Sequence, residues 1–466
     1  MKTTHKTFLV LMLVLIPVLM IASCTFQPAA APTATPLSAT QEPAIIEVSF
    51  GIGDAALDAK TRHSLESLVA LFEKSHPNIK IVLDSWGWNS QEFAADLATG
   101  KVPATMSVPP TEAHMLIDSN YVADITAMMS AWAVSQDFNQ AVLAPFVRAG
   151  RIYAVPTSIY IMGLFYDKQL FRGAGLVDSD GEPVPPTTWD EFIEAAKAIK
   201  AKTGAVGFCM FTQHNQGGWT FMNWGWQAGG EFERQEGDQW QAVFDEQPIV
   251  EAMQLIKDLR WEHDVLQDEL LFDVGRSFPM VASHQCGMVM FTPDWFEIVV
   301  NEHGGNPDDL GLTILPAGPA SRANVMGGGY TVINAKTSPE VQQAAFEWIT
   351  WRMFSLEALE TEIKSKGGFA RWSISTRSLM YKPSSGAAQQ EQELVDKYRN
   401  VPYFKTYVEE AGKHARPEPP IATQELYAAL DGVIQAVLTD ENADPQALLT
   451  EAVQQFQAEY LDTLGE

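Results

Sequence analysis

The order of apolar and polar residues after position 44 predicts a strand, a helix and a second strand. The first strand is indicated by apolar residues at every second position, namely Ile46, Val48, Phe50 and Ile52. The helix is expected to begin near Ser64 and to carry an apolar stripe formed by Leu65, Leu68, Val69 and Phe72. The second strand shows the same alternation at Ile79, Ile81 and Leu83. This spacing predicts a parallel βαβ unit with a right-handed crossover.

Further along the chain, helix starts are marked by capping residues. Such residues precede amphipathic stretches at Thr188, Ser338 and Asp444. Glu191 completes a capping box after the first of them, while Pro339 and Pro445 follow the other two in the position that favours a first helical turn. Because apolar runs typical of strands alternate with these helices, the chain is predicted to be an α/β protein.

The N-terminus has the features of a secretion signal. Lys2 and Lys6 flank the start of the chain, and the apolar run 8–22 is too short to span a bilayer comfortably. The run ends in Ile-Ala-Ser-Cys, which resembles the bacterial lipobox. Residues 1–23 are therefore predicted to be a lipoprotein signal peptide and Cys24 to be lipidated, the alternative being an ordinary signal peptide with an incidental cysteine. Segment 24–43, rich in Ala, Pro and Thr, is predicted to be an extended tether.

Length and charge narrow the class of protein. A chain of 466 residues with 46% hydrophobic composition is expected to form two or more domains. The formal charge of -27, from 31 basic and 58 acidic residues, disfavours nucleic acid as a partner and favours a soluble monomer.

One motif suggests a cofactor, but its context argues against it. Residues 51–56 match the dinucleotide pattern G-x-G-x-x-A directly after a strand. The helix, however, is expected near Ser64 rather than at Gly53, and Asp84 lies beyond the roughly 20 residues that the fingerprint expects. Motifs for metal ligation or an activated nucleophile are missing from the sequence. We therefore expect no cofactor, no metal and no catalytic residue, although a pair of glycosidase carboxylates could still converge in space.

Two cysteines remain after Cys24. Cys209 and Cys286 both lie in apolar runs that look like buried strands. They could form a disulfide in an oxidising compartment or be two small buried hydrophobic residues, and the second possibility is slightly favoured.

Several segments together resemble the family 1 extracellular solute-binding proteins, the group that includes maltose-binding protein. The most specific match is carried by Gly150-Arg-Ile-Tyr-Ala-Val-Pro156, by Leu164-Phe-Tyr-Asp-Lys-Gln-Leu-Phe171 and by Pro185-Pro-Thr-Thr-Trp-Asp-Glu-Phe192. Further matches are Gly287-Met-Val-Met290 leading to Trp295, Gly327-Gly-Gly-Tyr330 before Ser338-Pro-Glu340, and Arg416-Pro417. The resemblance spans about residues 44–466.

The resemblance implies a two-lobed fold of the periplasmic-binding-protein type II class. It implies an N-lobe made of residues 44–158 and 328–374 and a C-lobe made of residues 159–327 and 375–466. The chain would cross between the lobes near 158–161, near 327–330 and near 371–377. Such crossings act as hinges when lobes close as rigid bodies, and consecutive glycines suit that role.

A sugar site needs flat aromatic surfaces and polar side chains in a desolvated cleft. By the resemblance, Trp295 is at the cleft-lining Trp of the family, Trp219 is at a position for an aromatic stacker, and Tyr160 lies at the first hinge. Loops after predicted strands add weaker candidates, namely Asp54, Trp86, Trp88, Thr111 and Glu112, for which a solvated loop residue is the simpler interpretation. Gly328, Tyr330 and Trp372 could face the cleft or merely pack the hinge. Trp224 and Trp226 are predicted to be core residues.

The function implied by the resemblance is that of a receptor for an ABC importer. The protein would capture a mono- or oligosaccharide by lobe closure and deliver it to membrane permease subunits, while the lipid anchor holds it on the extracellular or periplasmic side of the membrane. We expect a binding protein and not an enzyme. A surface glycoside hydrolase, a receptor for a non-sugar solute and an adhesion or scaffold protein are the alternatives.

Overall fold

The first sheet is built around the βαβ unit that the hydrophobic pattern predicts. The computed structural model describes residues 44–53, 59–89, 92–237, 239–365, 379–382, 385–398 and 404–464. Strand β1 (Ile46–Gly51) pairs in parallel with β2 (Ile79–Asp84), and helix α1 (Ala59–Ser75) connects them. The helix begins at Ala59, five residues before the predicted start, because an apolar stripe marks only the part of a helix that packs on the core and polar residues can precede it.

This sheet has the strand order β14-β13-β3-β1-β2, and β6 pairs with β13. The additional strands are β3 (Thr105–Val108), β6 (Ala154–Ile161), β13 (Asn324–Ile333) and β14 (Ala415–Pro417). Strand β3 runs parallel to β1, whereas β13 is antiparallel to both β3 and β6. The carboxyl ends of β1 and β3 therefore lie at one edge of the sheet, where open α/β sheets bind ligands.

The second sheet has the strand order β12-β7-β11-β8. Its strands are β7 (Gly163–Asp167), β8 (Val206–Cys209), β11 (Cys286–Phe291) and β12 (Leu310–Ile314). Every residue of β11 and of β12 is buried, as expected when helices cover both faces of a sheet. The apolar runs around the two cysteines are thus confirmed as buried strands.

Cys209 and Cys286 form a disulfide within this sheet, with their Cα atoms 6.0 Å apart. The slight preference for two unpaired thiols was wrong. The periodicity of a strand shows that a cysteine is buried, but it cannot show which other strand lies beside it.

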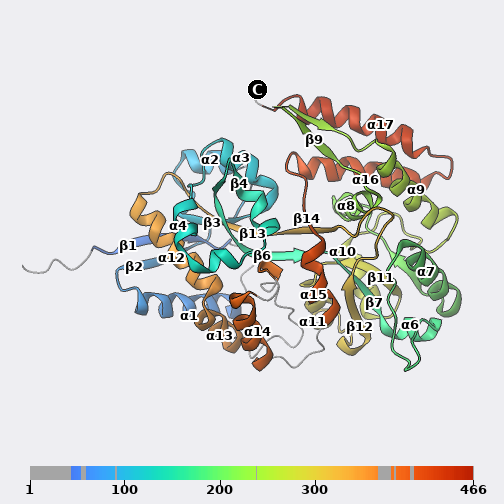
Figure 1. Ribbon diagram of the computed structural model, residues 1–466, viewed down its shortest axis with the longest axis horizontal. Helices are drawn as coiled ribbons and strands as arrows, with labels where there is room; N and C mark the ends of the chain where they lie inside the picture. The colour runs from blue at the N-terminus through green and yellow to red at the C-terminus, as the bar shows by residue number, and fades with distance from the viewer. Residues whose placement is uncertain are drawn as a thin grey trace, which may run out of the picture. The chain divides into compact units, whose positions relative to one another are not determined.

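Strands β6 and β13 link the two sheets. Strand β6 belongs to the first sheet and is followed directly by β7 of the second, and Figure 1 shows β6 and β13 running from one group of elements to the other. The pairing of β6 with β13 is continuous from Ala154 to Ile161 apart from a register shift after Gly329. The predicted first and second crossings fall on these two paired strands.

The remaining elements cover the sheets or connect them. In the region before β7 they are α2 (Phe93–Ala98), η1 (Pro110–Glu112), α3 (Ala113–Asp118), α4 (Thr126–Ala131), η2 (Ala133–Asp137), α5 (Gln140–Leu143), η3 (Ala144–Phe146), β4 (Val147–Arg148) and β5 (Arg151–Ile152). Between β7 and β13 they are α6 (Lys168–Ala174), α7 (Trp189–Thr203), α8 (Gln216–Ala228), β9 (Glu233–Glu236), β10 (Gln239–Ala242), α9 (Gln247–Trp261), α10 (Val274–Ala282), α11 (Trp295–Asn301) and η4 (Pro307–Asp309). After β13 they are α12 (Pro339–Phe354), α13 (Leu356–Ser365), α14 (Gly386–Tyr398), α15 (Lys405–His414), α16 (Thr423–Thr439), α17 (Pro445–Phe456) and η6 (Gln457–Leu461).

The predicted helix caps are present. Thr188, Ser338 and Asp444 each accept a backbone N–H of the first turn, at the starts of α7, α12 and α17. The capping box at α7 has additional contacts, because the Glu191 carboxylate accepts from the backbone N–H and the hydroxyl of Thr187 as well as from the backbone N–H of Thr188. Local sequence therefore determined where these helices begin.

Helix α14 packs with the elements of the first sheet. Lys397 donates to Glu360 of α13 at 2.9 Å, and the N–H of Ala387 donates to Asp137 of η2 at 2.9 Å. The boundary that the resemblance implies at residue 375 would instead place α14 with the second sheet. Residues 371–377, where the third crossing was predicted, lie outside the described residues.

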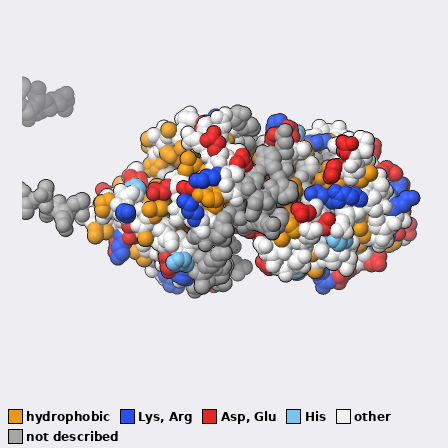
Figure 2. Space-filling view, turned by 90° about the horizontal axis from the view of Figure 1, so that it is seen from below, with side chains coloured by type: hydrophobic (Ala, Val, Ile, Leu, Met, Phe, Trp, Pro, Cys, Tyr) orange, Lys and Arg blue, Asp and Glu red, His pale blue; other side chains and the backbone are white. Residues whose placement is uncertain are grey.

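The surface carries charges of both signs. Figure 2 shows acidic and basic side chains interspersed over the described part of one face. Exposed ion pairs include Lys80 with Glu47 and Arg234 with Glu246. Such pairs add little stability but favour solubility. Within the described residues, no helix has both the length and the apolar character needed to cross a bilayer.

Candidate functional site

Three predicted ligand residues come together beside the crossing strands. Tyr160 lies on β6, Trp219 in the first turn of α8 and Trp295 at the start of α11. The ring centroids of Tyr160 and Trp219 are 5.8 Å apart, and those of Trp219 and Trp295 are 5.6 Å apart, both in edge-to-face geometry. Each of the three side chains is only partly buried. We refer to them as the aromatic trio, which offers an accessible apolar surface built from three separate elements.

Trp295 is supported by the core on one side. Its ring contacts those of Phe211, Phe278 and Phe291 at centroid distances of 6.2, 5.9 and 5.2 Å. Core packing therefore explains part of its environment, as the alternative interpretation of this residue proposed. Because the side chain is still partly exposed, packing and ligand contact are compatible, and the packing fixes the orientation of the indole.

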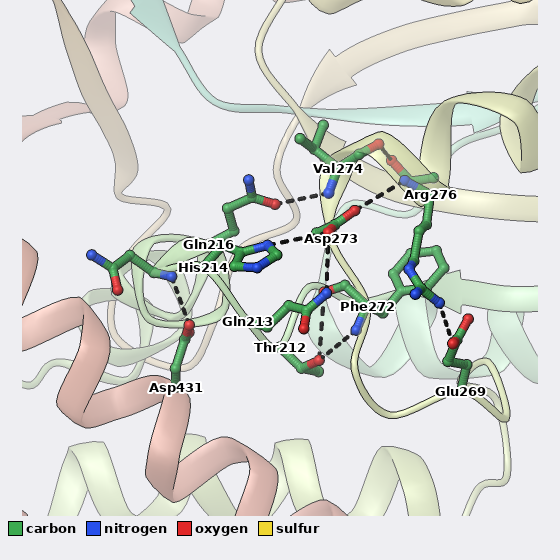
Figure 3. A network of polar contacts seen from close by, with 12 residues as sticks. Thr212, Gln213, His214, Gln216, Glu269, Phe272, Asp273, Val274, Arg276 and Asp431 are labelled. Carbon is green, nitrogen blue, oxygen red and sulfur yellow. Dashed lines mark hydrogen bonds and ion pairs between the residues drawn. The ribbon is translucent and has the colours of Figure 1, made fainter.

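The start of α8 is held in place by a carboxylate from another helix. Asn215 has a positive φ of 66° and does not cap α8 with its own side chain. Asp431 of α16 instead accepts the N–H groups of Asn215 and Gly218, each at 2.7 Å, and Figure 3 shows its carboxylate directed at this turn. A Cβ atom on Gly218 would lie 2.3 Å from the carbonyl oxygen of Tyr427, so only glycine permits this close approach. The position of Trp219 thus depends on α16.

The loop before α8 is fixed from the other side by residues 272–274. Gln213 donates to Asp273 at 3.0 Å, and the side-chain oxygen of Gln216 accepts the N–H of Val274 at 2.8 Å. Figure 3 shows these contacts meeting around Asp273, with His214 also directed at its carboxylate. The loop is therefore held on both flanks, which limits the motion of Trp219.

The glycines of β13 leave room for the side chains of β6. Gly327 is paired with Tyr160, and a Cβ atom on Gly327 would lie 2.1 Å from the Tyr160 hydroxyl. Gly329 is paired with Ser158, whose hydroxyl accepts the N–H of Gly329 at 2.9 Å. Gly328 adopts a φ of 152°, and a Cβ atom there would meet the carbonyl oxygen of Ser158 at 2.0 Å. Gly328 therefore serves the backbone of the crossing, and its neighbour Gly327 shapes the space that Tyr160 occupies.

Glu418 lies against the aromatic trio and was not predicted from the sequence. Its carboxylate accepts the hydroxyl of Tyr427 at 2.8 Å and a hydrogen bond from Trp219. Burial raises the pKa of Glu418 to about 7, and the hydrogen bonds oppose this shift. Only its position two residues after Arg416-Pro417 could have drawn attention to it, because the contact depends on how the chain returns to the site after α15.

Asp294 is a second carboxylate near the trio. Asp294 is an exposed residue, yet partial desolvation of its carboxyl group raises its pKa. Burial also raises the pKa of Tyr160, and the charges of Glu418 and Asp294 raise it further. Both carboxylates therefore lie close enough to act on the same hydroxyl.

A hydroxyl-rich cavity of about 300 Å³ lies at the carboxyl ends of β1 and β3. Its polar lining includes the side chains of Ser64, Ser107, Thr157, Ser158 and Thr331. Ser158 is two residues from Tyr160 on β6 and thus on the same face of that strand. The cavity is also lined by the charged residues Arg352 and Glu362, and its hydroxyl groups can donate and accept hydrogen bonds.

The other predicted ligand residues in loops have contacts within the protein that do not require a ligand. The Trp86 indole donates to Asp96 at 3.0 Å, and Trp86 and Trp88 both pack on Phe93. Thr111 and Glu112 lie in η1 and are partly buried. Burial and the charge of Glu425 on α16 raise the pKa of Glu112. These contacts account for Trp86, Trp88 and Glu112 without a ligand, and ligand contacts for them stay predictions.

Tyr330 does not face a ligand. Its side chain is 1% exposed, its hydroxyl donates to the carbonyl of Val142 at 2.7 Å, and its ring packs on Phe146. The structure therefore favours the packing alternative considered for Tyr330, because the residue is buried in the core. Trp224 and Trp226 are buried, as predicted.

Three predicted sites lie outside the described residues, namely Asp54, Trp372 and the lipidation site Cys24. Within the described residues, no group of three or more His, Cys, Asp or Glu side chains is arranged to hold a metal ion.

Glu233 lies close to this region, and the raised pKa of its carboxyl group predicts that the free energy of unfolding falls as pH rises. Burial raises its pKa to about 8; Oε2 accepts the N–H of Ile421 at 3.3 Å, and Oε1 has no partner among the described residues. The unfolded chain releases this proton near the ordinary value of 4.5, so the free energy of unfolding should fall as pH rises from there to about 8. Because Glu233→Gln stays neutral, we expect it to reduce this decline in thermal denaturation curves.

Part of the decline should remain in the Glu233→Gln variant, because Glu418 also has a raised pKa. Glu441→Gln, at an exposed position, serves as the control and should follow the wild-type curve. Parallel curves for wild type and Glu233→Gln would contradict the assignment.

Comparison with known proteins gives the family. The sequence profile of the bacterial extracellular solute-binding protein family matches residues 58–352, more than half of the chain. The chain belongs to this family.

Individual relatives are distant. A protein of Brucella abortus named as a binding protein is 24% identical over 309 residues, covering 62% of this chain and 68% of that protein. An arabinooligosaccharide-binding protein of Halalkalibacterium halodurans is 24% identical over 196 residues, which are 42% of this chain and 38% of that protein.

Solved structures share the fold. The cyclic alpha-maltosyl-1,6-maltose binding protein of Arthrobacter globiformis matches with a TM-score of 0.68 and 21% identity, over 89% of this chain and 98% of that one. The maltose-maltodextrin binding protein of Alicyclobacillus acidocaldarius matches with a TM-score of 0.62 and 18% identity, over 88% of this chain and 100% of that one. The predicted fold class, a two-lobed α/β fold of the periplasmic-binding-protein type, is confirmed.

Proposed function

We propose that this protein is the substrate-binding receptor of an ABC importer and that its solute is a carbohydrate. The observation that carries the proposal is the aromatic trio, whose partly exposed rings meet at the crossing strand β6, where Ser158 of the same strand lines a cavity with several hydroxyls. A sugar presents apolar C–H faces and a rim of hydroxyls, which such a site complements. The relatives named for arabinooligosaccharide and for maltodextrin binding support the same class of ligand.

The solute would be gripped where β6 and β13 link the two lobes. Closure of the lobes is stabilised only by contacts that exist in the closed state. The free energy of ligand binding therefore also drives the closure that the permease recognises. Paired strands such as β6 and β13 suit a hinge that keeps the lobes in register while they rotate.

The protein would act at the cell surface. The lipobox-like sequence at Cys24 and the tether at 24–43 support a lipid anchor that holds a monomer on the extracellular or periplasmic side, within reach of permease subunits. The disulfide agrees with folding in an oxidising compartment.

A surface glycoside hydrolase is a second candidate, favoured only by the carboxylates near the trio. Glu418 and Asp294 could in principle act as an acid and a base, since desolvation raises the pKa of both. Release of an unaltered sugar after binding supports the receptor, whereas product formation from an oligosaccharide would support the hydrolase.

Trp295→Ala is expected to weaken sugar binding by more than about tenfold, or about 1.4 kcal/mol, because it removes one face of the trio. The change should leave the protein folded, since Trp295 is partly exposed. Isothermal titration calorimetry against the best sugar from a thermal-shift screen measures the effect.

Trp261→Ala is a matched control, because Trp261 is 39% exposed on α9 and its ring is not part of the trio. This control should bind the sugar like the wild type. Equal affinities for wild type and Trp295→Ala would remove Trp295 from the site.

A further inference from the structure

The two carboxylates beside the aromatic trio have no cationic partner among the described residues. Glu418 is partly buried and is hydrogen-bonded to Tyr427 and Trp219, which are both uncharged. Asp294 is exposed, and within the described part of the chain neither carboxylate takes part in an ion pair. A partly buried carboxylate such as that of Glu418 is unfavourable without a positive partner, because hydrogen bonds replace only part of its hydration.

The nearest arginine in sequence is already engaged elsewhere. Arg416, two residues before Glu418, forms an ion pair with Glu231. Its guanidinium also lies over the ring of Trp226, 4.5 Å from the centroid. Arg416 therefore neutralises Glu231 and stacks on a core tryptophan, which leaves the charge of Glu418 without compensation from this side chain.

The aromatic trio adds a second feature that attracts positive charge. The face of an indole or phenol ring carries a negative potential, so a cation near the face is attracted to it when water is excluded. The rings of Trp219 and Trp295 are inclined to each other by 63°, and those of Tyr160 and Trp219 by 86°. Rings inclined in this way form walls rather than a single flat platform.

We propose that the solute carries a protonated nitrogen, and that the site is suited to an amine-bearing sugar rather than to a neutral one. The nitrogen would be held by the aromatic faces and the two carboxylates, that is by Tyr160, Trp219, Trp295, Asp294 and Glu418. A cation supplies the missing counter-charge of the carboxylates and is at the same time attracted by the rings. The inference rests on the proposed function, because it specifies the class of sugar that the same site takes.

A neutral sugar would leave the carboxylates of the site without a counter-charge. Its hydroxyls can donate hydrogen bonds to Glu418 and Asp294, but they carry no positive charge to balance a carboxylate. The acidic balance of the whole chain, with a formal charge of -27, would further favour the approach of a cation.

The test uses pairs of sugars in which the nitrogen is either a protonated amine or an uncharged acetamide. Binding of glucosamine and of chitobiose is compared with that of N-acetylglucosamine and N,N′-diacetylchitobiose, with glucose as a further neutral probe, by calorimetry on the full chain. We expect each amine to bind at least about tenfold more tightly than its acetylated partner. Glu418→Gln, which keeps the shape of the side chain, should reduce this preference to less than about threefold.

Glu262→Gln, at an exposed position on the end of α9, is the matched control and should keep the full preference. Equal or tighter binding of the neutral partners by the wild type would overturn the inference and leave the proposed sugar receptor standing. A preference for amines that survives in both Glu418→Gln and Asp294→Asn would also overturn it. Failure of every sugar in the set, charged and neutral, to bind would count against both the inference and the proposed function.

Discussion

Replacing Gly327 by alanine is expected to reduce affinity for the solute by about 100-fold, or about 2.7 kcal/mol, while the protein stays folded. The added Cβ atom would lie 2.1 Å from the hydroxyl of Tyr160 and 2.7 Å from a carboxylate oxygen of Glu418. Both side chains must then move, and both belong to the site. Because Tyr160 is only partly buried, it can rotate away without opening the core, so binding should suffer more than stability.

Calorimetric titration of Gly327→Ala with the solute preferred by the wild type measures this effect. Gly432→Ala is a matched control on α16, since a Cβ atom there meets nothing within 4 Å. Alanine in that exposed helical position should stabilise the protein by up to about 1 kcal/mol and leave binding unchanged. Wild-type affinity in Gly327→Ala would show that the glycine serves only the hinge and that Tyr160 and Glu418 do not contact the solute.

Removing the Cys209–Cys286 disulfide is expected to lower the free energy of unfolding by about 4 kcal/mol. The bond closes a long loop, with a sequence separation of 77 residues, and so restricts the unfolded chain. Cys209→Ala and Cys286→Ala should each cause nearly the full loss, and the double variant should be little worse than either, because one substitution already breaks the bond. Urea denaturation of the three variants measures these differences.

Reduction provides an independent check on the disulfide. Dithiothreitol should lower the melting temperature of the wild type by several degrees and leave that of the double variant unchanged. Losses that add up from the two single variants, together with alkylation of both thiols in the unreduced native protein, would show that the cysteines are unpaired.

The secondary structure near capping residues could be predicted because its causes are local. A side-chain oxygen at Thr188, Ser338 or Asp444 reaches N–H groups only two or three residues away, so a short window of sequence contains the whole interaction. Strand alternation in β1 and β2 has the same character. The start of α1 was predicted five residues too late, because the apolar stripe begins only at Leu65 and the first residues of the helix precede it.

The candidate site was predicted in part. Tyr160, Trp219 and Trp295 were named through the family resemblance, and the structure brings them together. Tyr330 was named on the same grounds but is buried, with its hydroxyl donating to the carbonyl of Val142. Glu418 was missed, because neither spacing nor composition distinguishes it from the other acidic residues of the chain.

By itself, the sequence determined the α/β class, the helix starts at the capping residues and the buried strands, and the family resemblance named three aromatic residues that the structure brings together. Tertiary structure alone decided which cysteines are bonded, which carboxylates stand beside the aromatic trio, and why Gly327 must lack a side chain. The physical reason is the range of the interactions. Periodicity and capping act within a few residues, whereas these contacts join strands and helices far apart in the chain, and only the packed fold brings them within reach.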